Sequence, residues 1–227
     1  KNVEMNANSR LSLEEVKDRS GVLRERLQTL GGTEVEIVAV TKGYGPWALR
    51  AAFECGFKMV GESYAQELES KWMQLKDHER RRIEVHFIGG TQTNKVRKIA
   101  HIVEVWQSVD RPSLVDEIAK RAPSSPVMIQ INLTGIKNQS GCRISEAGDI
   151  VSNARAQGLD VVGVMGIGPQ GDAEIIRAAY RSLVSFAEDH GLAHRSIGMT
   201  DDLEIAIESG STMVRIGTAL FGERPAR

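Results

Sequence analysis

The sequence predicts an α/β fold, a single (β/α)8 TIM barrel with an extra N-terminal helix. Short apolar runs rich in Val and Ile alternate with longer amphipathic segments, and eight such runs recur about every 25 residues. The runs are apolar throughout, as is typical of parallel strands buried on both faces. No low-complexity linker divides the chain, so residues 1–227 are expected to form one domain. A doubly wound open sheet is the competing fold, because it shows the same alternation.

The first amphipathic segment predicts a helix over 12–30, with Ser12 as N-cap, Glu15 at the capping-box position and Gly31 as its end. An apolar run over 35–42, bounded by glycines, predicts the first strand. Later strands are expected at 57–60, 85–88, 103–108, 127–133, 161–165, 194–197 and 212–216. Helices are expected at 47–55, 62–76, 91–101, 112–122, 145–157, 173–190 and 202–209, followed by a short turn at 218–221.

Composition excludes several classes of function. With 29 basic and 30 acidic residues the net charge is −1, which gives no support to a nucleic-acid or anionic-membrane partner. No apolar run is long enough to cross a membrane, and no signal-peptide core is present, so a cytoplasmic location is expected. Cys55 and Cys142 lie far apart with no CxxC and are interpreted as reduced thiols. The five histidines show no metal-binding spacing, so no metal is expected, and size and charge permit a monomer.

Lys42 is the first candidate functional residue. It follows the apolar run at 37–41, at the carboxyl end of a predicted strand, where α/β folds bind ligands. Desolvation there disfavours the ammonium form and lowers a lysine pKa from about 10.4, and a neutral amine can hold an aldehyde as a Schiff base. The simpler alternative is that Lys42 extends to solvent without a function.

The segments after the last two strands predict an anion site. In barrels these loops commonly bind phosphate. Ser196, Thr200 and Thr218 supply hydroxyls there, and Gly198 and Gly217 allow a ligand close to the backbone. The alternative is that these small residues only form tight turns.

Two further polar residues lie within apolar strands. Arg215 near the end of the last strand needs an anion or acceptor if it is buried, and the candidates are a phosphate, a ligand ring nitrogen, or a structural ion pair with Asp201 or Asp202. His86 either lines the mouth of the barrel or is a hydrogen-bonded core residue, which is the commoner role of a lone histidine on an apolar strand.

Residues 166–171 match the G-x-G-x-x-G pattern of dinucleotide-binding folds. The match starts with only about 60 residues remaining, too few for the two halves of that fold. Pro169 also removes an N–H that would face a pyrophosphate. A nicotinamide enzyme is therefore the least favoured function.

Taken together, these segments resemble the pyridoxal 5′-phosphate (PLP) homeostasis proteins, the YggS/PROSC family of PLP-binding single-barrel proteins. The fold that this resemblance implies is similar to the N-terminal domain of alanine racemase. The matches follow one another along nearly the whole chain in the family's order. They are VAVTK at 38–42, GESYAQE at 61–67, HFIG and QTNK within 86–95, SVDR at 108–111, QINL at 130–133 and the long segment 196–222.

The resemblance implies that Lys42 carries PLP as an internal aldimine and that Arg215 lies near the pyridine nitrogen. An arginine there, in place of an acid, would leave that nitrogen largely unprotonated and weaken the electron sink. The family's phosphate cradle falls on Ser196, Gly217 and Thr218, with Met199 beside the ring. Strand position and resemblance together give these cofactor-binding candidates: Lys42, Ser63, His86, Ser196, Gly198, Met199, Arg215, Gly217 and Thr218.

The implied function is PLP (vitamin B6) homeostasis as a carrier or regulator, with PLP-dependent apoenzymes as expected partners. No catalytic residue is assigned and no vigorous turnover is expected, because the sequence lacks the C-terminal β-domain that brings the second base of alanine racemases. A PLP-dependent amino-acid racemase, or a related fold-type III enzyme, is the alternative. A further alternative is a barrel that binds another phosphate ester, in which Lys42 contributes only its positive charge.

The sequence departs from the family pattern at several positions. Ser63 stands where Asn is usual, which puts an expected contact near the ring in doubt, and Gly166 stands in place of Thr. Gln107 replaces a His, and Ile136 and Gln139 replace a Glu and a Lys. Because Lys42 and the phosphate cradle are retained, PLP binding is still expected.

Overall fold

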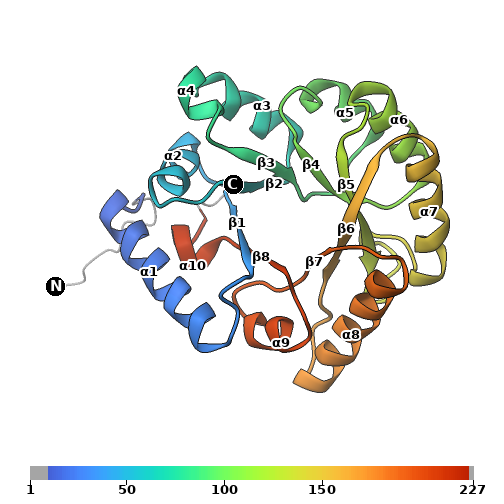
Figure 1. Cartoon of the computed structure of the whole chain (residues 1–227). Coiled ribbons are helices and arrows are strands. Elements are labelled where there is room, and N and C mark those ends of the chain that lie inside the picture. Colours follow the sequence, from blue (N-terminus) through green and yellow to red (C-terminus); the bar gives the residue numbers. More distant parts are fainter. Residues whose placement is uncertain (1–9, 225–227) are drawn as a thin grey trace.

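Eight parallel strands close into a barrel surrounded by helices, which confirms the predicted fold and excludes the open sheet (Figure 1). The computed structural model describes residues 10–224. Each strand pairs with the next in chain order, and the first pairs with the last. The strands are β1 (Glu36–Val40), β2 (Met59–Glu62), β3 (Glu84–Phe87), β4 (Val105–Val109), β5 (Pro126–Asn132), β6 (Asp160–Ile167), β7 (His194–Ser196) and β8 (Met213–Ile216).

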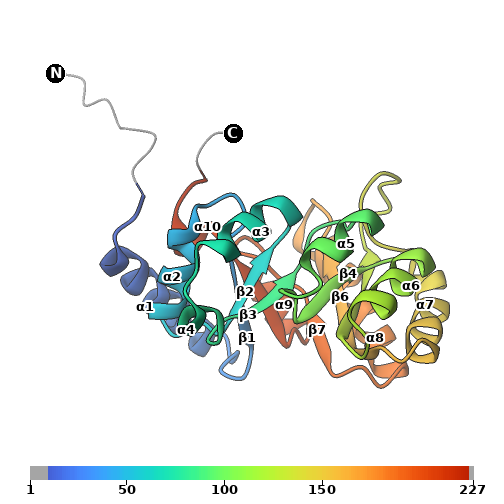
Figure 2. The same ribbon diagram turned by 90° about the horizontal axis from the view of Figure 1, so that it is seen from above.

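The helices lie outside the strands (Figure 2), and all but α1, which precedes β1, and α10, which follows β8, connect one strand to the next. They are α1 (Leu13–Thr29), α2 (Pro46–Glu54), α3 (Ala65–Met73), α4 (Asp77–Arg80), α5 (Thr93–Ile99), α6 (Pro112–Arg121), α7 (Ile144–Ala156), α8 (Ala173–Asp189), α9 (Leu203–Glu208) and α10 (Thr218–Phe221). The extra helix α1 begins at the predicted capping box, in which Ser12 N donates to Glu15 Oε2 at 2.8 Å and Glu15 N donates to Ser12 Oγ at 3.2 Å. It packs against α2 and α10 and covers that flank of the barrel.

The barrel closes between its first and last strands, where Val38 on β1 pairs with Arg215 on β8. Apolar side chains fill both sides of the wall. A large cluster lies between strands and helices, whereas a smaller one inside the lumen consists of Val38, Val105, Met128, Met165 and Met213. Three of these five are methionines, whose flexible side chains suit an irregular lumen.

The largest differences from the predicted element boundaries are at β2 and the helix that follows it. Strand β2 runs from Met59 to Glu62, two residues later than expected, so Glu62 belongs to the strand and not to the following helix. The helix expected over 62–76 is α3 (Ala65–Met73), and the separate short helix α4 follows it. The physical reason is pairing: Gly61 and Glu62 extend the ladder to His86 and Phe87 on β3.

Within residues 10–224, no helix is long and apolar enough to cross a membrane. The same residues contain no cluster of three or more His, Cys, Asp or Glu side chains arranged to hold a metal ion.

Candidate functional site

A pocket opens at the carboxyl ends of the strands, on the side of the barrel where β1 meets β8. Its empty space, counted together with the open solvent at its mouth, is about 660 Å³. Five of the nine cofactor-binding candidates meet in its wall: Lys42, Met199, Arg215, Gly217 and Thr218. Thr200, which was predicted for the anion site, lines it as well. The remaining lining residues are Val40, Ile88, Met165, Ile167, Asp201 and Arg224.

Lys42 is partly buried and lies two residues after the end of β1, and the residue before it, Thr41, is held by two buried side chains. Thr41 Oγ1 donates to Glu62 Oε1 at 2.7 Å, and Lys71 Nζ donates to the carbonyl oxygen of Thr41 at 2.7 Å. Lys71 Nζ also lies 2.6 Å from Glu62 Oε1. Both charged side chains are almost wholly buried, so this ion pair fixes the end of β1 from inside the protein.

The residue after Lys42 is held by the same group of charges. Gly43 N donates to Glu67 Oε1 at 2.6 Å, and that oxygen lies 2.6 Å from Lys71 Nζ. The backbone is therefore anchored on both sides of Lys42, which limits the directions its side chain can take. Burial raises the pKa of Glu62, and the nearby Lys71 ammonium opposes that rise.

Arg215 is a buried residue of the pocket wall and is bound to backbone and hydroxyl groups. Its Nη1 donates to the carbonyl oxygen of Ser196 at 2.6 Å and to Ser196 Oγ at 2.9 Å, and its Nη2 donates to the carbonyl oxygen of Gly166 at 2.8 Å. Among the described residues no carboxylate lies within ion-pair distance of it, so the considered ion pairs with Asp201 and Asp202 are absent there. Burial lowers the pKa of Arg215.

Asp202 instead fixes the loop that carries Met199. Its Oδ1 accepts from Met199 N at 2.6 Å, and its Oδ2 accepts from the hydroxyl of Tyr180 on α8. Burial raises the pKa of Tyr180, so this hydroxyl stays a donor. Tyr180 carried no signal in the sequence, and Asp202 was considered only as an ion-pair partner of Arg215, because the contact between them joins α8 to a loop 22 positions away.

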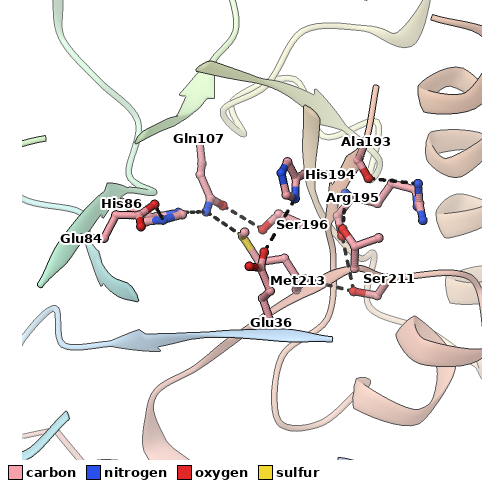
Figure 3. A network of polar contacts seen from close by, with 11 residues as sticks. Glu36, Glu84, His86, Gln107, Ala193, His194, Arg195, Ser196, Ser211 and Met213 are labelled. Atoms are coloured by element: carbon pink, nitrogen blue, oxygen red, sulfur yellow. Dashed lines mark hydrogen bonds and ion pairs between the residues drawn. The ribbon is translucent and has the colours of Figure 1, made fainter. Parts of the chain in front are cut away.

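Ser196 and Gly198 do not line the pocket but lie beneath it. The Ser196 side chain is fully buried, and its hydroxyl donates to Gln107 Oε1 at 2.8 Å across the lumen (Figure 3). Gly198 accepts from the backbone N–H of Arg215 at 3.0 Å. The structure thus places these two predicted residues as supports of Arg215.

His86 and Ser63 lie away from the pocket. His86 is buried in the lumen, not at the mouth, where its Nε2 is 3.0 Å from Glu84 Oε1 and its Nδ1 is 2.6 Å from Gln107 Nε2 (Figure 3). Ser63 lines a separate depression with Gln92 and Lys95, and its Oγ is buried without a hydrogen-bond partner among the described residues.

The G-x-G-x-x-G match belongs to the barrel. Gly166 lies within β6, and its carbonyl accepts from Arg215. A Cβ at Gly166 would lie 2.6 Å from Leu183 Cδ1, so a larger residue here would require the end of that leucine side chain to shift. The closed barrel excludes the open sheet in which this motif binds dinucleotides.

Comparison with known proteins identifies the family of this barrel. Residues 12–225 match the family of alanine racemase N-terminal domains. The pyridoxal phosphate homeostasis protein of Aquifex aeolicus is 35% identical over 97% of this chain and 99% of its own length. The chain belongs to the pyridoxal phosphate homeostasis protein family.

Solved structures agree with membership of the pyridoxal phosphate homeostasis protein family. PipY of Synechococcus elongatus, crystallised with PLP bound, is 26% identical with a TM-score of 0.80, covering 91% of this chain and all of that one (100%). A protein of unknown function from Bifidobacterium adolescentis is 28% identical with a TM-score of 0.86, covering 95% of this chain and 99% of that one.

Proposed function

We propose that this protein binds PLP in the pocket at the end of β1 as a Schiff base on Lys42 and acts in PLP homeostasis as a carrier or regulator. The observation that carries the proposal is that Lys42 shares one pocket with Arg215, Gly217 and Thr218. The naming of the Aquifex relative and the PLP bound to PipY support the choice of ligand.

The residues of the pocket fit the phosphate of this ligand. Gly217 is buried against β1. A Cβ atom added to it would lie 3.3 Å from the carbonyl oxygen of Val40, which is closer than most contacts that Cβ atoms make in proteins. Its small size leaves the backbone accessible at the point where Thr218 adds a hydroxyl to the pocket wall. Backbone N–H groups beside a hydroxyl are a common way to hold phosphate oxygens.

The free hydrogen-bond donors of Arg215 fit the pyridine ring of PLP. Its described contacts use three N–H groups, and a guanidinium has five, so Nε and one hydrogen of Nη2 are left for an acceptor in the pocket. A pyridine nitrogen is such an acceptor. When bound, PLP supplies an electron sink, and an arginine that donates to its nitrogen leaves that sink weak. This arrangement suits holding the cofactor better than turning over amino acids.

The test is the visible absorption spectrum of the purified protein with added PLP. We expect a band that borohydride bleaches, and a pyridoxyl group on the Lys42 peptide by mass spectrometry. Lys42→Ala should lose the band, whereas Lys58→Ala, a matched change outside the pocket, should keep it. A wild-type protein that stays colourless with excess PLP would refute the proposal and leave a site for another phosphate ester.

One observation bears on the alternative, an amino-acid racemase. Such an enzyme needs a second acid–base group besides Lys42, and Asp201 is a carboxylate in the pocket wall. Loss of α-deuterium from labelled amino acids by the PLP-loaded wild type, but not by Asp201→Asn, would favour the racemase. For a carrier, the wild type and both variants, Asp201→Asn and Lys42→Ala, should show equally little exchange.

For a carrier the natural recipients are PLP-dependent apoenzymes in the cytoplasm. The transfer is tested by mixing the PLP-loaded protein with an apoenzyme and following recovery of its activity in the presence of a scavenger of free PLP. Recovery that exceeds that given by an equal amount of free PLP supports direct delivery. Light scattering of the same sample tests the expected monomer.

A further inference from the structure

Polar side chains cross the lumen in an unbroken row from Arg215, in the pocket wall, to Glu84 at the start of β3 (in part in Figure 3). Arg215 Nη1 lies 2.9 Å from Ser196 Oγ, and Ser196 Oγ lies 2.8 Å from Gln107 Oε1. Gln107 Nε2 lies 2.6 Å from His86 Nδ1, and His86 Nε2 lies 3.0 Å from Glu84 Oε1. Ser196, Gln107 and His86 are at most 1% exposed, so water does not substitute for these contacts.

The direction of every hydrogen bond in this row follows from its first member. A guanidinium only donates, so Ser196 Oγ accepts from Arg215 and must place its own hydrogen elsewhere. The acceptor in reach is Gln107 Oε1. The amide nitrogen of Gln107 therefore faces His86, and it donates to Nδ1.

This order determines the protonation of His86. Because Nδ1 accepts a hydrogen bond, it carries no proton, and the ring proton lies on Nε2, which donates to Glu84. The reverse orientation of the Gln107 amide would place an N–H against Ser196 Oγ, which already accepts from Arg215. The serine hydrogen would then lose its acceptor, at a cost typical of a buried unsatisfied polar group.

We propose that Gln107 is a positioning residue that orients Arg215 through Ser196 and holds His86 as the tautomer protonated on Nε2. Gln107 sits on β4 and reaches across the lumen to β7, so it links two strands on different sides of the barrel. Its amide also contacts Met213 Sδ on β8 at 3.2 Å, which limits its rotation. The part of the proposal that concerns Arg215 and PLP rests on the proposed function.

The tautomer is measured directly by ¹⁵N chemical shifts and long-range ¹H–¹⁵N correlations of the imidazole rings in the ligand-free protein. The His86 signals are assigned with a His86→Gln variant. We expect a protonated Nε2 and an unprotonated Nδ1 in the wild type. In Gln107→Glu both side-chain oxygens accept, so His86 Nδ1 should become protonated. A wild-type His86 protonated on Nδ1 would overturn the proposal, whether or not the protein binds PLP.

The link to Arg215 is measured as the affinity for PLP by fluorescence titration. Gln107→Leu removes the acceptor of Ser196, and we expect the affinity to fall about 5- to 10-fold, as for the loss of one buried hydrogen bond. Gln130→Leu is the matched control, because Gln130 is a buried glutamine on β5 that donates to Ser140 and not to this row. Equal affinities of Gln107→Leu and wild type would refute the positioning role. An equal loss of affinity in Gln107→Leu and Gln130→Leu would also refute it, because the loss would then come from disturbed packing in general.

Discussion

Lys71 donates a hydrogen bond to the carbonyl oxygen of Thr41 at 2.7 Å, one residue before Lys42. A buried ammonium thus fixes the backbone from which the candidate PLP lysine extends. The same ammonium contacts Glu62, which is buried, and Glu67, which is partly exposed.

Lys71→Met should lower the free energy of unfolding by about 3–5 kcal/mol, because it leaves Glu62 buried without its partner. Urea denaturation measures the change. The double variant Lys71→Met/Glu62→Gln should recover part of the loss, since the unpaired charge is then removed. Lys58→Met, outside this cluster, should change stability by less than about 0.5 kcal/mol. Equal stability of the single variant and wild type would contradict the assignment of this ion pair.

Tyr180→Phe should loosen the loop that carries Met199. The variant removes the donor to Asp202 Oδ2 while Met199 N still donates to Oδ1. We expect a loss of about 1–3 kcal/mol in stability and faster hydrogen exchange at the Met199 amide. Unchanged exchange at that amide would show that Asp202 fixes the loop without help from Tyr180.

Gly198→Ala should be strongly destabilising for two separable reasons. The residue has φ of +101°, and an added Cβ would lie 2.5 Å from the Cβ of Ala206. Gly210→Ala is the matched control, because Gly210 has φ of +96° but its nearest neighbour would lie at 3.7 Å. Thermal denaturation should show about 1–3 kcal/mol of conformational strain in both variants, with a further loss from overlap only in Gly198→Ala. Equal losses would contradict the close approach of Ala206.

Cys142 should stay a thiol in the folded protein well into alkaline conditions, because burial raises its pKa to about 12 from 9.0. A raised pKa means that the stability contributed by the thiol is complete below pH 9 and declines as the pH rises toward 12. In a Cys55→Ser background, iodoacetamide at pH 9.5 should label Cys142 slowly in buffer and rapidly in denaturing urea. Fast labelling of the folded protein, read by mass spectrometry, would contradict the burial.

Sequence periodicity predicted the barrel and the elements that bring Lys42, Arg215, Gly217 and Thr218 to one edge. That prediction succeeded because all parallel strands of a barrel end on the same side, so strand order alone places those residues together. The resemblance to the family added the expected ligand.

What sequence reasoning missed depends on the direction of single side chains. Glu62 ends a very short strand beside a helical pattern, so the boundary was placed too early and its partner Lys71 was not recognised. Ser196 lies on a strand of three residues, too short for a pattern to show that its hydroxyl points into the lumen. The sequence also did not predict how deep in the lumen His86 lies. The alternation of residues along a strand predicts which face of the sheet a side chain is on, but not its position along the barrel axis.

The pairing of β1 with β8 makes the pocket a late product of folding. Lys42 comes from the beginning of the chain, while Arg215, Gly217 and Thr218 come from its end. On the ribosome, where synthesis runs from the N-terminus, Lys42 is therefore exposed long before the groups that complete its surroundings have been made. A nascent chain of this protein can bind its ligand specifically only after the segment that carries Arg215, Gly217 and Thr218 has emerged.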